Sequence, residues 1–176
     1  MKKTFILSLL FCFLFIKLGI TQTTKSNTTY NITTLSIAAL KDKIAFSKKD
    51  FKIVYLFKQY CSATQQGFPS VDSLYKQATQ HNFELFVVTT NPKKKQEELL
   101  DHLFFNNYSE PFYIIDDSFF LNFHSKLIKA ICETCNHKDM GYTDFMIFGK
   151  DNQLILHTTY QQSVEEHIAI LKTYIK

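Results

Sequence analysis

The stretch FKIVYLFKQYCSATQQGFP, from Phe51 to Pro69, decides the fold because its pattern changes from strand to helix around one cysteine. Residues 51–57 form an apolar run rich in aromatic and β-branched side chains, which predicts a buried strand. A helical pattern follows, so Cys61 lies where the strand ends and the helix begins. The first amides of a helix have no backbone partner and favour negative charge, which stabilises a thiolate placed there. The stretch therefore predicts a reactive cysteine.

The same stretch resembles the active site of thioredoxin-fold proteins, most closely the envelope thiol reductases of the TlpA/ResA type. In that family an aromatic-rich strand leads into W-C-x-x-C, and a helix proline follows at a set spacing. Tyr60 occupies the position of the tryptophan, Cys61 that of the first cysteine, and Pro69 has the family's spacing. The resemblance covers residues 45–176. It implies an α/β domain with a thioredoxin-like fold: a central mixed sheet, helices on both faces, and a C-terminal β-hairpin followed by a helix.

The sequence departs from the family pattern at three positions. Thr64 replaces the second cysteine, Gly67 stands where the TlpA/ResA type often has a glutamate, and Tyr142 stands where the family has a cis proline. A cis bond before a residue other than proline costs about 2.5–4 kcal/mol, so we expect a trans bond before Tyr142. The resemblance implies a substrate groove formed by Tyr60, Thr64, Tyr142 and Thr143.

A second cysteine pair, Cys132 and Cys135, has C-x-x-C spacing, and the sequence leaves three roles open for it. In an oxidising compartment the simplest arrangement is a Cys132–Cys135 disulfide with Cys61 free. The family fold also brings this segment near the active-site loop, which makes either cysteine a candidate to resolve a mixed disulfide at Cys61. The third role is zinc binding together with His124 and His137. One C-x-x-C without a second pair does not specify such a site, and we expect neither a metal nor a cofactor.

Two classes of function are compatible with these residues. In the first, Cys61 is the nucleophile in thiol–disulfide exchange with a polypeptide or with a small-molecule thiol or disulfide. In the alternative, the protein is a non-catalytic thioredoxin-fold module that binds a partner polypeptide around Tyr60, Cys61 and Tyr142. Thr64 cannot perform the resolving step of the two-cysteine enzymes, so the sequence leaves open whether the protein is an enzyme, and Cys61 could equally be an unused thiol.

Residues 1–21 have the pattern of a secretory signal peptide, with Lys2 and Lys3 before an apolar run. A bilayer span needs about 20 apolar residues, and Lys17 interrupts this run, so we expect no stable membrane span after cleavage. Secretion into the periplasm or cell envelope is the predicted destination. Three of the 20 lysines lie in the signal, which leaves 17 against 16 acidic residues. This near-neutral balance argues against a nucleic-acid partner.

Residues 22–44 are predicted to be a flexible leader, because their Thr-, Asn- and Ser-rich start has little apolar content. Residues 35–46 fit a short helix and a strand equally. In the domain from 45 to 176, strands and helices alternate, and we expect one mixed sheet whose last two strands are antiparallel. The predicted strands are 51–58, 83–90, 111–116, 144–149 and 153–159, and the predicted helices are 69–80, 93–105, 119–132 and 163–175.

Overall fold

The structure is a computed structural model that describes residues 30–78, 81–89, 95–108, 110–116 and 123–175. The predicted signal peptide at 1–21 and the first part of the predicted leader, residues 22–29, lie outside the described residues.

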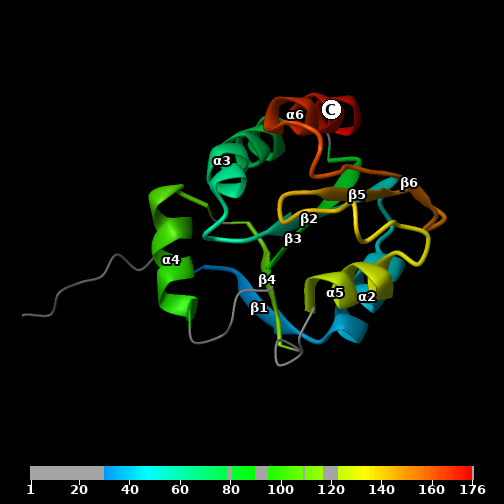
Figure 1. Cartoon of the computed structure of the whole chain (residues 1–176), viewed down its shortest axis with the longest axis horizontal. Helices are drawn as coiled ribbons and strands as arrows, with labels where there is room; N and C mark the ends of the chain where they lie inside the picture. Colours follow the sequence, from blue (N-terminus) through cyan, green and yellow to red (C-terminus); the bar gives the residue numbers. More distant parts are fainter. Residues whose placement is uncertain (1–29, 79–80, 90–94, 109, 117–122, 176) are drawn as a thin grey trace, which may run out of the picture.

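The described strands form one mixed sheet in the order β1-β4-β3-β2-β5-β6 (Figure 1). Strands β1 to β4 are parallel to one another, β5 is antiparallel to β2, and β6 is antiparallel to β5. The predicted single sheet and its antiparallel C-terminal pair are confirmed. The strands are β1 (Ile32–Leu35), β2 (Phe51–Phe57), β3 (Phe83–Thr89), β4 (Phe112–Ile115), β5 (Phe145–Phe148) and β6 (Leu154–His157). The helices are α2 (Ile37–Phe46), α3 (Ser62–Gln77), α4 (Gln96–Phe105), α5 (Phe123–Ile131) and α6 (Val164–Tyr174).

Helices cover both faces of this sheet, as predicted (Figure 1). On one face α2 and α5 pack over a core to which β2 contributes Val54 and Leu56. On the other face α3, α4 and α6 pack over a core to which β2 contributes Ile53, Tyr55 and Phe57. Successive residues of β2 therefore enter two different apolar cores, which is why this strand shows no polar alternation in the sequence.

The expectation of a flexible leader is wrong for residues 32–44, which form β1 and most of α2. β1 is an edge strand that pairs with β4 alone, so one neighbour supplies its hydrogen bonds and it needs little apolar content of its own. The Ser36 side chain accepts a hydrogen bond from the Ala39 amide at 3.1 Å and caps α2. Leu40 is fully buried against the sheet. The ambiguous segment 35–46 is therefore mainly a helix.

Helix α3 begins earlier than predicted, at Ser62 rather than at residue 69. Proline is common in the first turn of a helix, but here Pro69 lies inside α3, where it has no amide hydrogen to donate to Gln65 one turn earlier. The earlier start places Cys61 directly at the N-terminus of α3.

Candidate functional site

Cys61 is the last residue before α3 and has an extended backbone conformation, with φ −88° and ψ 121°. Its amide donates to the carbonyl of Lys58 at 3.0 Å, and its carbonyl accepts a hydrogen bond from the Gln65 amide at 3.1 Å. The thiol is free, and the residue is half-buried. The predicted strand-to-helix junction is confirmed, and Cys61 occupies the N-cap position next to first-turn amides that have no acceptor within the helix.

Thr64, which the resemblance aligned with a second cysteine, is fully buried. Its hydroxyl accepts a hydrogen bond from the Lys58 amide and donates one to the Tyr142 carbonyl, both at 3.5 Å. Thr64 thus connects the turn after β2, the first turn of α3 and the loop before β5. Two residues of the predicted groove, Thr64 and Tyr142, are brought together in this way.

The residue Tyr142 is exposed, with 40% of its surface accessible. The ammonium of Lys58 lies 4.1 Å from the centre of its ring, and the imidazole of His124 lies 4.4 Å from it, centroid to centroid. Burial lowers the pKa of His124, and the positive charge of Lys58 acts in the same direction. The described residues contain no cis peptide bond, so the bond before Tyr142 is trans, as predicted.

Tyr60, the second aromatic residue of the predicted groove, is 57% exposed. The ammonium of Lys95 lies 5.4 Å from the centre of its ring and pairs with Glu98 at 2.7 Å. Both exposed tyrosines of the predicted groove, Tyr60 and Tyr142, therefore have a lysine over the ring, a geometry in which the π-system attracts the cation.

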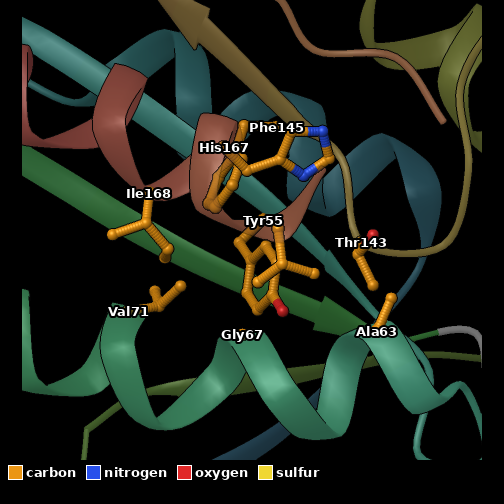
Figure 2. A pocket seen from close by; sticks show the side chains of 9 residues that line it. Tyr55, Ala63, Gly67, Val71, Thr143, Phe145, His167 and Ile168 are labelled. Atoms are coloured by element: carbon orange, nitrogen blue, oxygen red, sulfur yellow. The ribbon is translucent and has the colours of Figure 1, made fainter. Parts of the chain in front are cut away.

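Thr143, the last predicted groove residue, lines a small pocket between α3 and α6 (Figure 2). Its volume of about 10 Å³ has room for about one water molecule. The phenol of Tyr55 points from β2 toward α3. Burial raises the pKa of Tyr55, and negative charge on Cys61 or Asp144 raises it further. The pocket is lined by Tyr55, Ala63, Gly67, Val71, Thr143, Phe145, Val164, His167 and Ile168.

Gly67 lies where α3 and α6 approach each other closely. A Cβ at this position would lie 3.2 Å from Val164 Cγ1 and 3.8 Å from the Tyr55 hydroxyl. A larger side chain would have to displace Val164. Gly67 thus fits the close approach of the two helices, and position 67 supplies no carboxylate to the cysteine.

Sequence reasoning missed a buried polar cluster at the start of β5. Asp144 is fully buried, and His167 of α6 is 3% exposed. His167 Nε2 lies 3.3 Å from Asp144 Oδ1, the Thr158 hydroxyl donates to the same oxygen at 3.2 Å, and the Gly141 amide donates to the other oxygen. The four residues follow no motif and come from three separate segments, so no local signal connects them all.

Cys132 and Cys135 form a disulfide, and Cys61 is the free cysteine of the described part of the chain. Both bonded cysteines are buried in the core between the sheet and the α2 and α5 helices. This is the simplest of the three roles that the sequence left open. In the ranges that the structure describes, no group of three or more His, Cys, Asp and Glu side chains could hold a metal ion.

No protein-family model matches the chain, and no curated protein matches it either. Solved structures do match. A thioredoxin-family thiol:disulfide interchange protein from Chlorobium tepidum has a TM-score of 0.54 at 12% identity, over 73% of this chain and 82% of that one. StoA from Bacillus subtilis has a TM-score of 0.51 at 14% identity, over 70% and 84%. A thioredoxin-like protein solved in its oxidized form has a TM-score of 0.54 at 12% identity, over 88% and 95%.

The chain has a thioredoxin-like fold. The fold class predicted from the Tyr60–Cys61 stretch and the alternating elements is thereby confirmed. At such low identities the likeness extends to the fold alone, and the chemistry must be argued from Cys61 and its neighbours. None of the described helices of this thioredoxin-like chain is both long and apolar enough to cross a membrane.

Proposed function

We propose that this protein performs thiol–disulfide exchange through Cys61 in the periplasm or cell envelope. The observation that carries the proposal is a free, half-buried thiol at the N-cap of α3. The exposed ring of Tyr142 lies on the neighbouring loop, and the Tyr142 carbonyl accepts a hydrogen bond from Thr64 in the first turn of α3. A solved structure with the same fold, that from Chlorobium tepidum, is described as a thiol:disulfide interchange protein, which supports this chemistry.

The N-terminus of α3 suits the first half of the exchange. The thiolate of Cys61 attacks one sulfur of the partner's disulfide, so the partner's S–S bond breaks and a bond from Cys61 to the partner forms. The second partner sulfur leaves as a thiolate and takes up a proton from water. The positive end of the α3 dipole lies at the reacting sulfur and favours the negative charge there.

The second half of the exchange needs a thiol from outside this site. Thr64 carries a hydroxyl, and Cys132 and Cys135 are bonded to each other. An external thiolate that attacks the partner's sulfur restores the Cys61 thiolate and leaves a disulfide between the external thiol and the partner. We therefore expect Cys61 to form mixed disulfides and to release them slowly.

Incubation of the folded protein with oxidised glutathione tests the first half. Intact mass spectrometry should show a glutathione adduct at Cys61, and Cys61→Ser should carry one adduct fewer than the parent. The matched control, Cys132→Ala/Cys135→Ala, should keep the Cys61 adduct. If the folded protein stays unmodified while the urea-unfolded protein forms the adduct, the Cys61 thiol is not available and the proposal is rejected.

The exposed tyrosines favour a second candidate, a non-catalytic module that binds a partner polypeptide. Tyr60 and Tyr142 are 57% and 40% exposed, and exposed aromatic rings are common at protein interfaces. The two candidates separate in strains that carry single replacements. Exchange predicts that Cys61→Ala has the phenotype of a deletion. The module predicts that Cys61→Ala behaves like the parent and that Tyr142→Ala behaves like the deletion.

Export is part of the proposal and rests on the pattern of residues 1–21. The Cys132–Cys135 disulfide supports it, because such bonds persist in oxidising compartments. We expect the protein in the envelope fraction with Gln22 as its first residue, as read by N-terminal sequencing. Recovery of the full-length chain in the cytoplasm would reject export.

A further inference from the structure

Asp144 is a fully buried carboxylate at the base of the loop that bears Tyr142. One of its oxygens accepts a hydrogen bond from the Gly141 amide, and the other accepts from the Thr158 hydroxyl and faces His167 Nε2. These neighbouring groups come from three segments: the loop before β5, the residues after β6, and α6. A buried charge is costly unless several donors satisfy it, so this convergence has a physical reason.

The surroundings of the donors settle which atoms hold protons. Thr158 Oγ1 already accepts the amide of Phe145 at 2.8 Å, so its own hydrogen is directed to Asp144. His167 Nε2 also lies 3.2 Å from the carbonyl of Thr159. Because both neighbours of this nitrogen are acceptors, it bears a proton. The Gly141 amide and the Thr158 hydroxyl therefore donate to Asp144, which matches an ionised carboxylate, and His167 Nε2 donates to the Thr159 carbonyl beside it.

Asp144 holds the loop of residues 141–143 at both ends. Its side chain binds the amide of Gly141, and its backbone carbonyl accepts a hydrogen bond from the Leu56 amide at 2.9 Å near the end of β2. Tyr142 lies between these two anchors and accepts the hydrogen bond from Thr64. The carboxylate thus holds the Gly141 end of a loop that contacts the first turn of α3.

We propose that Asp144 is a positioning residue of the Cys61 site: its buried carboxylate holds loop 141–143 so that Tyr142 stays against Thr64. The inference rests on the proposed exchange at Cys61 and deepens it, because Thr64 and Cys61 belong to the same turn. Asp144 acts through the loop and does not itself react. A released loop would uncover the first turn of α3 and make Cys61 react faster with small reagents.

The titratable groups that face Asp144 come from three other elements: His167 on α6, His124 on α5 and Tyr55 on β2. Burial raises the pKa of Asp144, and its hydrogen-bond donors and the two histidines oppose that effect. Protonation of the carboxyl weakens it as an acceptor for the Gly141 amide. That amide therefore reports the state of the carboxylate.

The first experiment observes this amide directly. Met140–Gly141 is the only Met–Gly pair in the sequence, so methionine labelled at its carbonyl carbon together with ¹⁵N-glycine isolates the Gly141 amide by NMR. Its chemical shift should titrate with a midpoint above about 3.9, the ordinary aspartate pKa. Asp144→Asn should remove that titration, and an unchanged titration in this variant overturns the proposal.

The second experiment measures how fast iodoacetamide, a small neutral reagent, alkylates Cys61 in the folded protein. Asp144→Asn should raise the rate at least about threefold. Leu40→Ala, which removes a buried side chain from the opposite face, destabilises the fold without touching the cluster and should leave the rate unchanged. Thr158→Val, which removes one donor, should also raise the rate and replaces Asp144→Asn if that variant does not fold.

The outcomes separate the two proposals. Equal alkylation rates in the parent and in the folded cluster variant overturn the positioning role. An altered rate combined with no glutathione adduct in the parent rejects exchange at Cys61 and leaves the positioning role of Asp144 intact.

Discussion

Reduction of the Cys132–Cys135 disulfide should destabilise the fold and leave the chemistry of Cys61 unchanged. The two cysteines are separated by three positions, so the bond closes a short loop. For a loop of this size, the chain-entropy account gives a loss of about 2 kcal/mol in the free energy of unfolding at 25 °C. In a domain of this length, that loss lowers Tm by about 4–8 °C.

Packing around the bond should add little to this loss. Cys132 and Cys135 are 3% and 6% exposed and lie in the apolar core beside Ile131 and Met140. A reduced cysteine behaves as a small apolar side chain, so both thiols can stay in the same space. The entropy of the opened loop is therefore the main effect.

The assay is urea unfolding of Cys61→Ala, followed by circular dichroism, with and without a phosphine reductant. The Cys61→Ala background removes the free thiol, so the only reductant-sensitive group of the described chain is the disulfide. A variant that also carries Cys132→Ala and Cys135→Ala should not respond to the reductant. A loss below about 0.5 kcal/mol would refute the loop argument.

The same pair provides a functional readout in protein that retains Cys61. If Cys132 and Cys135 only stabilise the fold, Cys132→Ala/Cys135→Ala should release glutathione from Cys61 at the parent's rate. Slower release in this variant would show instead that the pair resolves the mixed disulfide.

Thr64→Cys should shorten the lifetime of the Cys61–glutathione adduct at least about tenfold, because an intramolecular thiol replaces an external one. A mass-spectrometric time course measures this, and an unchanged lifetime would contradict a resolving role for position 64. Lys58→Gln should slow the reaction of Cys61 with an anionic aromatic disulfide by about two- to fivefold at low salt. The reaction with cationic cystamine should slow less. The reason is that the Lys58 ammonium lies over the exposed ring of Tyr142 beside the site. Exposed Lys172→Gln on α6 is the control, and equal slowing of both reagents would indicate a structural effect. The folded state binds the Asp144 proton more tightly than the unfolded state does. The parent's free energy of unfolding, compared with that of Asp144→Asn, should therefore fall as pH rises from about 4 through the raised pKa of Asp144. Denaturant titrations measure both values, and a difference that does not change with pH would contradict this sign.

Most of the element order from residue 51 onward could be predicted because each element leaves a local signal. β2 is buried on both faces and is therefore apolar at every position except Lys52. α6 begins with a capping box of Ser163 and Glu166, which the sequence shows as a serine followed by acidic residues. The Asp-Asn turn between β5 and β6 marks the hairpin, and Asn152 there has a positive φ of 63°.

The segments whose structure was predicted wrongly are those that are stabilised by contacts with residues distant in the sequence. β1 contains two threonines and forms because β4 supplies its hydrogen bonds, so composition alone suggested a flexible leader. The predicted helix began at residue 69, yet α3 already begins at Ser62, where the turn after β2 ends. In both places a contact with another element outweighed the secondary structure that the local sequence favours.

The sequence by itself determined that Cys61 follows a buried strand and precedes a helix, that position 64 carries a hydroxyl, and that position 142 carries an aromatic ring. Only the tertiary structure decided that Thr64 meets Tyr142 and that Asp144 meets His167. The physical reason is that periodicity and capping act within one element. Contacts between side chains far apart in the sequence depend on how strands and helices pack, and no local pattern encodes that packing.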